Sequence, residues 1–236
     1  MTLQIEVVEH PARTCAAILV GAAAGGGHIV LSGGSTPREA YGALVDAVRA
    51  VGVDISRATL WFGDERCVPP DDGRSNYRMV KESLLDPLGD EHALPTVHRI
   101  RGELGPRDAA DEYEHELEAT GPDQFDVVLL GIGPDGHCAS LFPDQPTLSE
   151  QSRMVVGVEE AGLEPYVPRV SFTLRAIAKG KQVVFLASGE SKARAVAAAF
   201  GGNAVADPHV PSSLVVPLAK ELTVLLDPAA AAQLGA

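Results

Sequence analysis

The chain alternates between short apolar runs and longer segments that are alanine-rich or amphipathic. Short runs rich in Val, Ile and Leu are typical of buried strands, whereas apolar positions at helical spacing indicate helices. This pattern predicts strands over residues 4–8, 28–31, 58–62, 125–130, 154–158, 169–172, 182–187 and 223–226. It predicts helices over residues 11–24, 38–50, 75–85, 105–119 and 188–200, and it leaves residues 201–220 unassigned.

The succession of strand and helix favours an α/β fold. Apolar strands separated by helices predict a mostly parallel sheet flanked by helices on both faces. The length of 236 residues would fit one large domain or two small ones, but the chain shows no internal repeat and no obvious linker. We therefore expect a single Rossmann-like domain over residues 1–236.

The composition narrows the range of partners. The chain is 45% hydrophobic and 22% charged, as in ordinary globular proteins, and its formal net charge is −13. An acidic surface disfavours nucleic acid and anionic membranes, but it does not exclude an anionic small substrate in a locally basic pocket. No apolar stretch reaches the roughly 18 residues of a membrane span, and the N-terminus lacks a signal-peptide pattern.

Cysteine and histidine usage indicates the compartment and argues against a metal. Cys15, Cys67 and Cys138 share no metal-ligand spacing and cannot all pair with one another, which suits a reducing cytoplasm. The histidines other than His137 show no His-x-x-x-His or carboxylate ligand spacing, so we expect no metal site. We therefore expect a cytoplasmic protein without nucleic-acid or membrane partners.

The segment after the predicted strand 125–130 carries the densest group of candidate catalytic residues. Gly131, Gly133 and Gly136 let backbone amides approach a ligand, because glycine has no Cβ. Asp135 and His137 follow a buried strand at its carboxyl end, where open α/β sheets place their sites. The alternative is a tight turn in which Asp135 caps the backbone and His137 is incidental.

Two other interpretations of this segment are less favoured. Its glycines match the Gly-x-Gly-x-x-Gly fingerprint of dinucleotide sites, which requires a long helix directly afterwards. Pro143 and Pro146 limit the following segment to less than two helical turns, so we do not expect a dinucleotide. Cys138 beside His137 suggests a nucleophile and base, but side chains of neighbouring residues usually diverge, and nothing argues for an activated thiol.

A second glycine-rich loop follows the predicted strand 28–31 and indicates an anion site. It consists of Ser32, Gly33, Gly34, Ser35 and Thr36. Pro37 fits the first position of the next helix, with Thr36 as its N-cap. Glycine amides, hydroxyl groups and the helix dipole together suit a phosphate. No Gly-Lys-Ser/Thr follows, so the loop is not a Walker A motif, and an ordinary capped turn is the alternative.

Further charged residues lie at other strand ends. Lys192 is expected in the first turn of the helix over 188–200, where a lysine opposes the helix dipole unless an anion lies between them. Asp64 and Arg66 follow a strand directly; Arg66 would clamp an anion, and Asp64 would fix a sugar hydroxyl or a neighbouring cation. Arg169 is a further candidate for an anion contact. The alternatives are a solvated lysine, solvated loop charges and structural salt bridges.

Taken in order, the motifs of the chain resemble those of the 6-phosphogluconolactonases. The matching segments are Leu-Ser-Gly-Gly-Ser-Thr-Pro at 31–37, Trp-Phe-Gly-Asp-Glu-Arg at 61–66, Ser-Asn-Tyr at 75–77, Gly-Ile-Gly-Pro-Asp-Gly-His at 131–137 and Ala-Ser-Leu-Phe-Pro at 139–143. The resemblance runs over nearly the whole chain. It implies hydrolysis of 6-phospho-D-glucono-1,5-lactone to 6-phosphogluconate, the second step of the oxidative pentose phosphate pathway, with no metal and no organic cofactor.

The candidate residues support a mechanism for this reaction. His137 would act as general base on a water that attacks C1, since imidazoles titrate near neutral pH, and Asp135 could orient the ring. The loop over 32–36, together with Lys192 and Arg169, would hold the phosphate. Loop amides or Arg66 would stabilise the oxyanion, and the sequence does not choose between them.

Two alternatives share the scaffold. A deaminase-like isomerase is one, because glucosamine-6-phosphate deaminases share the Ser-Gly-Gly-Ser-Thr loop; they carry Asp-Glu-Tyr where this chain has Asp-Glu-Arg at 64–66, and a catalytic Glu where it has Phe142. A non-catalytic sugar-phosphate sensor is the other; such sensors carry a DNA-binding helix-turn-helix, which we do not expect here because little sequence precedes the first predicted strand and the net charge is wrong for DNA. We expect a small phosphorylated sugar lactone as the ligand, and a monomer or weak homodimer.

Overall fold

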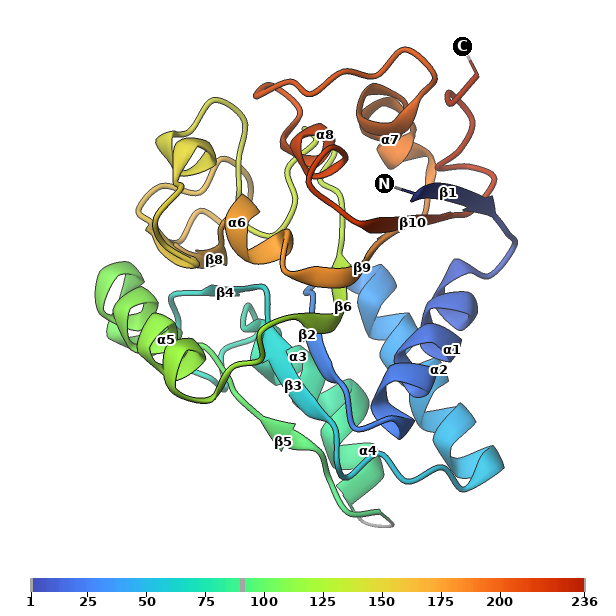
Figure 1. The fold of residues 1–236 in the computed structure, drawn as a ribbon, viewed down its shortest axis with the longest axis vertical. Coiled ribbons are helices and arrows are strands. Elements are labelled where there is room, and N and C mark those ends of the chain that lie inside the picture. The colour runs from blue at the N-terminus through green and yellow to red at the C-terminus, as the bar shows by residue number, and fades with distance from the viewer. Residues whose placement is uncertain (1, 90–91, 236) are drawn as a thin grey trace.

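Among the residues that the computed structural model describes, 2–89 and 92–235, seven strands form one parallel sheet (Figure 1). The strands lie in the order β1-β10-β9-β6-β2-β3-β5, and every neighbouring pair is parallel. Their bounds are β1 Thr2–Val7, β2 His28–Leu31, β3 Thr59–Phe62, β5 Thr96–Val97, β6 Phe125–Leu130, β9 Gly180–Ala187 and β10 Glu221–Leu226. Only β5 was not predicted, because two residues are too short to form a pattern.

Helices cover both faces of this sheet. In Figure 1, α1 (Pro11–Ala24) and α2 (Ser35–Val51) lie together on one side, and α5 (Pro106–Thr120) and α6 (Leu174–Ile177) lie on the other. The other helices are α3 (Asn76–Val80), α4 (Asp86–Gly89), α7 (Ala193–Phe200) and α8 (Pro211–Val215), and a π-helical turn, Lys81–Leu85, joins α3 to α4. The predicted fold class is therefore confirmed, whereas a single domain over 1–236 stays a prediction.

No helix in the described part of the chain is both long and apolar enough to cross a membrane.

The segment that the sequence left unassigned, 201–220, contains α8. This short helix packs against α7 and α6, on the side of the sheet away from α1 and α2.

Three short strands form a second, antiparallel sheet that the sequence did not indicate. They are β4 (Asp64–Arg66), β7 (Val155–Val158) and β8 (Arg169–Phe172), in the order β4-β8-β7. No strand was predicted over residues 64–66, because the partner strand β8 lies far along the chain. Gly63 connects β3 to β4, and the register places Arg66 beside Arg169.

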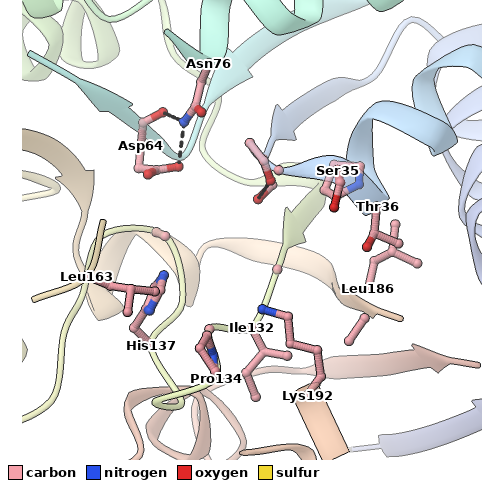
Figure 2. A pocket seen from close by; sticks show the side chains of 18 of the residues that line it. Ser35, Thr36, Asp64, Asn76, Ile132, Pro134, His137, Leu163, Leu186 and Lys192 are labelled. Atoms are coloured by element: carbon pink, nitrogen blue, oxygen red, sulfur yellow. Dashed lines mark hydrogen bonds between the residues drawn. The ribbon is translucent and has the colours of Figure 1, made fainter. Parts of the chain in front are cut away.

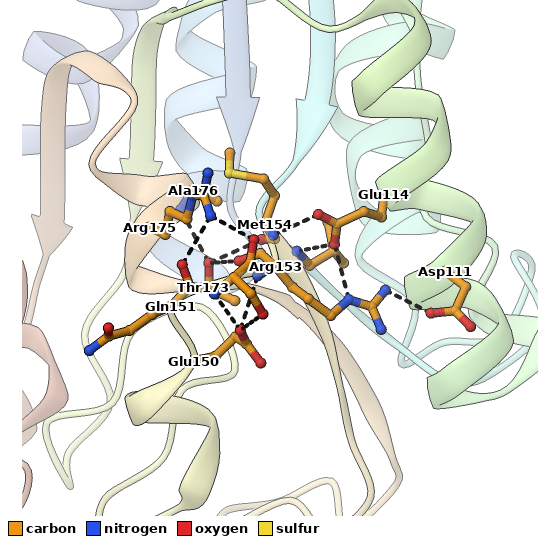
Figure 3. A network of polar contacts seen from close by, with 11 residues as sticks. Asp111, Glu114, Glu150, Gln151, Arg153, Met154, Thr173, Arg175 and Ala176 are labelled. Carbon is orange, nitrogen blue, oxygen red and sulfur yellow. Dashed lines mark hydrogen bonds and ion pairs between the residues drawn. The ribbon is translucent and has the colours of Figure 1, made fainter.

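A network of polar contacts fixes this second sheet to α5 (Figure 3). The Glu114 carboxylate accepts hydrogen bonds from the backbone amides of Met154 and Val155, at 2.8 and 2.9 Å. Arg153 pairs with the same carboxylate at 3.3 Å and with Asp111 at 2.7 Å. Because backbone amides removed from water need an acceptor, Glu114 holds the start of β7 against the helix.

Aromatic side chains fill the space between the main sheet and α5. Trp61, Tyr113 and Phe125 are fully buried, and the ring of Trp61 lies 6.0 Å from that of Tyr113 and 6.2 Å from that of Phe125. The Tyr113 hydroxyl accepts a hydrogen bond from the backbone amide of Phe62 at 2.8 Å, so the polar end of this buried ring has a partner. One tyrosine thus anchors a largely charged helix to the end of β3.

The order of the strands leaves a crevice between β2 and β6. After β2 the chain continues outward to β3 and β5, whereas after β6 it continues in the opposite direction to β9 and β10. The two strands are direct neighbours, with Ile29 beside Val127. Where the strand order of an open parallel sheet reverses, the loops at the carboxyl ends diverge and leave space for a ligand. Both glycine-rich loops emerge at this point.

Candidate active site

One pocket occupies this crevice, at the carboxyl ends of β2 and β6 (Figure 2). It is lined by most of the residues that the sequence singled out, namely Ser32, Gly33, Gly34, Ser35, Thr36, Asp64, Arg66, His137, Arg169 and Lys192. Asp135 lies outside the pocket lining but contacts His137. The fold therefore brings together segments that follow β2, β3, β6 and β9, along with one residue of β8.

The loop after β2 leads directly into α2, but the helix begins earlier than predicted. α2 starts at Ser35, and its N-cap is Gly34, with φ +107° and no capping side chain. The prediction of Thr36 as N-cap and Pro37 as first helical residue was wrong, because a glycine at positive φ turns the chain without a capping side chain. The first turn of α2 therefore lines the pocket, where the helix dipole favours an anion.

Tyr41 fixes the backbone of this loop from within the same helix. Its buried hydroxyl donates to the carbonyl of Ser32 at 2.7 Å and accepts from the Ser32 amide at 3.0 Å. Burial raises the pKa of Tyr41, so the hydroxyl keeps its proton at neutral pH. Both backbone groups of Ser32 are thus held by a residue nine positions away.

Asn76 closes the pocket beside this loop, and sequence reasoning gave it no role. It is buried, and its side-chain amide donates to the backbone carbonyl and the carboxylate of Asp64, at 3.0 and 3.1 Å. Gly33 faces the same side chain, since a Cβ at position 33 would overlap the Asn76 amide oxygen. The Ser-Asn-Tyr segment at 75–77, part of the resemblance, was the signal that pointed to this residue.

Asp64 and Glu65 are both buried, but they contact different parts of the structure. Asp64 lines the pocket and also accepts a hydrogen bond from the Ser140 hydroxyl at 2.8 Å. Glu65 accepts from the backbone amides of Asn76 and Tyr77, at 2.7 and 2.8 Å, and so supports the start of α3. Burial raises the pKa of Glu65, although these hydrogen bonds act in the opposite direction. The alternative of solvated loop charges is therefore wrong for both carboxylates.

His137 and Asp135 form a hydrogen-bonded pair at the carboxyl end of β6. Nδ1 of His137 lies 2.6 Å from Oδ1 of Asp135, and the same oxygen accepts from the His137 backbone amide at 3.2 Å. Burial acts to raise the pKa of Asp135, but the hydrogen bond and charge of His137 outweigh it and lower this pKa. An ionised carboxylate at Nδ1 favours the tautomer with hydrogen on Nδ1, which leaves the lone pair on Nε2.

The turn that carries this pair requires glycine at position 133. The Gly133 amide donates to the His137 carbonyl at 2.8 Å, and its carbonyl accepts from the Gly136 amide at 3.0 Å. A Cβ at position 133 would overlap Nδ1 of His137 and Oδ1 of Asp135. The next helical element is only the 3-10 turn Pro146–Ser149, so the glycine pattern lacks the helix that a dinucleotide site needs.

Two residues near His137, Phe142 and Cys138, are poorly suited to take part in catalysis. Phe142 is buried, and its ring centroid lies 4.8 Å from that of His137, so this position presents an apolar surface. Cys138 is fully buried, and burial raises the pKa of its thiol to about 12. A buried thiol that keeps its proton is a poor nucleophile at neutral pH, which argues further against a Cys–His pair.

Lys192 reaches the pocket from the loop after β9. It ends the 3-10 turn Glu190–Lys192 and directly precedes α7, so it lies just before that α-helix rather than within its first turn. Figure 2 shows its ammonium group directed into the pocket. Burial lowers the pKa of Lys192, and Asp135 opposes this effect. Within the described residues the ammonium group has no ion-pair partner, and a half-buried, unpaired cation in a pocket is a candidate for binding an anion.

Arg66 and Arg169 are cross-strand neighbours on another wall of the pocket. Arg169 is buried and donates to the carbonyls of Pro165 and Val167, at 2.8 and 3.1 Å. Burial lowers the pKa of Arg169, and the nearby charge of Arg66 lowers it further. Arg66 donates to the Arg74 carbonyl at 2.6 Å, but its buried Nε has no partner among the described residues. Two adjacent guanidinium groups with an unpartnered donor favour an electron-rich group beside them.

The fold and the pocket together define the class of protein. The chain is a parallel α/β protein whose pocket, at the reversal of strand order, joins a His–Asp pair to a helix N-terminus and three basic side chains. Across residues 2–89 and 92–235, no three His, Cys, Asp or Glu side chains are grouped as a metal site requires. The arrangement suits acid–base chemistry on an anionic small molecule.

Comparison with known proteins then gives the family. Residues 3–224 match the family described as glucosamine-6-phosphate isomerases/6-phosphogluconolactonase, and the chain belongs to this family. A 6-phosphogluconolactonase of Mycobacterium leprae is 41% identical over 215 residues, which cover 86% of this chain and 83% of that protein.

Two solved structures share the fold. A 6-phosphogluconolactonase from Trypanosoma cruzi has a TM-score of 0.82 and 27% identity, and the match covers 100% of this chain and 99% of that one. A monomeric glucosamine-6-phosphate deaminase has a TM-score of 0.81 at 21% identity, with 99% and 100% of the two chains covered. Since both kinds of enzyme share the scaffold, the choice between them depends on the residues of the pocket.

Proposed function

We propose that the chain hydrolyses 6-phospho-D-glucono-1,5-lactone to 6-phosphogluconate, a step of the oxidative pentose phosphate pathway. The observation that carries this proposal is one pocket that joins the His137–Asp135 pair to Lys192 and the loop after β2. The first group suits acid–base chemistry, and the second suits a phosphate. A phosphorylated lactone needs both, and the relative from Mycobacterium leprae carries the name of this activity.

His137 acts as the general base and then as the general acid. With Nδ1 held by Asp135, the lone pair of Nε2 is available to take a proton from the water that attacks C1. The resulting tetrahedral intermediate collapses by breaking the bond between C1 and the ring oxygen. The imidazolium of His137 returns the proton to that oxygen. The imidazole is then neutral again, and the opened product leaves as a hydroxy acid.

The phosphate anchors the substrate at the other end of the pocket. The first turn of α2 supplies backbone amides and the hydroxyls of Ser35 and Thr36, and Lys192 supplies a positive charge. Interactions with a group remote from C1 orient the lactone, so binding energy at the phosphate contributes to catalysis. Arg169, already bonded to backbone carbonyls, adds positive charge to the pocket wall and supports the loop over 163–167.

Arg66 is the strongest candidate for stabilising the oxyanion. Its Nε is buried beside the pocket and lacks a hydrogen-bond partner in the described part of the chain. A donor that is already desolvated and oriented stabilises developing negative charge more than a solvated one. We assign to Asp64, held by Asn76 and Ser140, the acceptance of hydrogen bonds from sugar hydroxyls.

The pocket favours lactone hydrolysis over the deaminase reaction. Phe142 occupies the position at which the deaminases carry a catalytic glutamate, and it is buried against the His137 ring. Without that carboxylate the chain lacks an acid–base group for opening the amino sugar ring.

We also propose a cytoplasmic location, because all three cysteines are free, and a monomer or weak homodimer.

The proposal is tested by assaying freshly generated 6-phosphogluconolactone with the wild-type protein and with His137→Ala. We expect the wild type to hydrolyse the lactone well above the spontaneous rate, and the variant to lose about 10²–10⁴-fold in kcat with little change in KM. Glucosamine 6-phosphate is assayed in parallel for ammonia release, which we expect to be absent.

Two results would contradict the proposed activity, and a third would contradict only the role assigned to His137. Ammonia release from glucosamine 6-phosphate would favour the deaminase. Tight binding of 6-phosphogluconate without any turnover of the lactone would favour a sugar-phosphate sensor. Full activity in His137→Ala would remove the assigned role of the imidazole, while leaving the lactonase activity itself in place.

A further inference from the structure

Ser212 lies far from the pocket in sequence, yet it bonds directly to the turn that carries the His–Asp pair. It is fully buried on α8, in the segment that the sequence left unassigned. Its backbone amide donates to the carbonyl of Gly136 at 2.9 Å, and its hydroxyl donates to the same carbonyl at 2.8 Å. Two donors from one residue on one carbonyl fix the direction of that carbonyl.

The peptide unit that Ser212 holds is the one that joins Gly136 to His137. Its carbonyl points at Ser212, and its N–H, which belongs to His137, donates to Oδ1 of Asp135 at 3.2 Å. A peptide unit is planar, so fixing the carbonyl also fixes the direction of the N–H on the opposite side. The oxygen that receives this N–H is the one that contacts Nδ1 of His137.

The backbone at Gly136 cannot hold this orientation by itself as firmly as an ordinary residue would. Gly136 has φ +85°, a conformation that glycine enters and leaves freely. Val210 packs against it so closely that a Cβ at position 136 would clash with the Val210 side chain. Contact with Val210 therefore excludes any residue with a side chain at position 136. The hydrogen bonds from Ser212 hold the Gly136 carbonyl in place instead.

We infer that Ser212 is a positioning residue for catalysis: through the Gly136–His137 peptide unit it orients the Asp135 carboxylate, and thereby the imidazole of His137. The inference rests on the proposed function, because it assigns a task to Ser212 within the same reaction. Ser212 is not among the residues that line the pocket. Its contribution is expected in kcat rather than in KM, since in the proposed function the phosphate is bound elsewhere in the pocket, by the loop after β2 and Lys192.

The chain offers a matched control at the next position. Ser213 is equally buried on the same helix, but its hydroxyl bonds within its own segment, accepting from the Asp207 amide at 2.8 Å. We expect Ser212→Ala to lower kcat by about tenfold or more with little change in KM, because small displacements of a catalytic group are costly. Ser213→Ala should leave kcat near the wild-type value, and Ser212→Thr, which keeps the hydroxyl, should recover most of the loss.

A double-variant cycle separates this role from a general effect on folding. If Ser212 acts through Asp135, then Ser212→Ala should have almost no further effect on kcat in an Asp135→Ala background, because the two changes break one chain of contacts. A full additional loss in that background would overturn the inference. Equal losses of kcat in Ser212→Ala and Ser213→Ala, with equal losses in Tm, would also overturn it.

A readout without activity keeps this test separate from the proposed function. Hydrogen exchange at the His137 backbone amide should be faster in Ser212→Ala than in the wild type or in Ser213→Ala, because the peptide unit loses the hydroxyl donor and keeps only the backbone amide of residue 212. Unchanged exchange at this amide would contradict the inference even in an active enzyme. Absence of lactone hydrolysis in the wild type would refute the proposed function, and the exchange measurement would still decide the role of Ser212.

Discussion

The loop after β2 and the turn after β6 form two corners of the pocket, and the rest of the chain supports them in different ways. At the corner after β2, the Ser32 backbone is bonded by Tyr41, nine residues away in the helix that directly follows. At the corner after β6, the Gly136 carbonyl is bonded by Ser212, 76 residues away on α8. The first corner is therefore a local unit of strand, loop and helix, whereas the second depends on a segment near the end of the chain.

The difference follows from what each corner has to hold. In the proposed mechanism the phosphate is bound by amides at the N-terminus of α2, so the helix that would bind it also stabilises the loop. In the proposed mechanism the corner after β6 presents an imidazole to the reacting carbon, and no long helix follows this corner. Its backbone groups need partners from elsewhere, because buried carbonyls and amides are costly to leave unpaired. We therefore expect changes at the first corner to act on KM and changes at the second to act on kcat.

Gly133→Ala gives the largest expected effect and tests the second corner. The added Cβ would overlap the atoms that join His137 to Asp135, so the pair has to separate. We expect kcat to fall by about 100-fold or more with KM nearly unchanged, as for a displaced general base. Gly42→Ala is the control, because a Cβ there meets nothing within 4 Å. Unaltered kcat in Gly133→Ala, measured by steady-state kinetics, would contradict the assigned geometry.

Tyr41→Phe tests the first corner and should have a smaller effect. Removing the hydroxyl leaves the amide and carbonyl of Ser32 without their partner, so the loop loosens. We expect KM to rise by about tenfold, and the free energy of unfolding to fall by about 1–3 kcal/mol. Tyr113→Phe serves as control, since its hydroxyl bonds the Phe62 amide and neither residue lines the pocket. A loss of kcat at constant KM in Tyr41→Phe would erase the distinction between the corners.

The pH dependence of product binding sharpens the role of Lys192. Burial lowers its pKa, so its positive charge is lost at a lower pH than for an exposed lysine, and only the protonated form attracts phosphate. We expect the affinity for 6-phosphogluconate, measured by calorimetry, to fall several-fold as the pH rises from about 7 to about 10. Lys192→Arg should bind with a flatter profile, because a guanidinium stays charged. Identical profiles in both proteins would rule out this explanation.

Glu114→Ala should leave the kinetics almost unchanged while lowering stability. The Met154 and Val155 amides lose their acceptor, which we expect to cost about 1–3 kcal/mol of unfolding free energy, measured with urea. Glu112→Ala on the same helix removes only an exposed pair with Arg101 and should cost less than about 1 kcal/mol. Equal losses of stability in the two variants would show that the network of Figure 3 does not hold the second sheet.

The corner after β2 was largely predictable from the sequence, because its parts are neighbours in the chain. An apolar run, a glycine-serine loop and a helix over 38–50 were sufficient to locate it, and only the start of the helix was placed wrongly. Gly34 caps the helix by its backbone conformation, and side-chain preferences carry no sign of that. The fold class followed in the same way from the succession of strands and helices.

The contacts of the corner after β6 were only partly predictable. Asp135 and His137 were found because they follow a buried strand, but the support from Ser212 depends on a contact between distant segments. The strand of Asp64 and Arg66 was missed for the same reason, since a polar triplet becomes a strand only beside β8. Asn76 carries no periodic or charge signal of its own, so only the folded chain shows that it holds Asp64.

One measurement tests most directly whether one corner binds the phosphate while the other performs the chemistry. The kcat/KM values of the wild type, Lys192→Ala and His137→Ala are compared on 6-phosphogluconolactone and on glucono-1,5-lactone, which lacks the phosphate. We predict that Lys192→Ala lowers kcat/KM by about tenfold or more on the phosphorylated lactone and has no effect on the other, whereas His137→Ala slows both. An equal loss on both lactones in Lys192→Ala would contradict the division of the pocket into two corners.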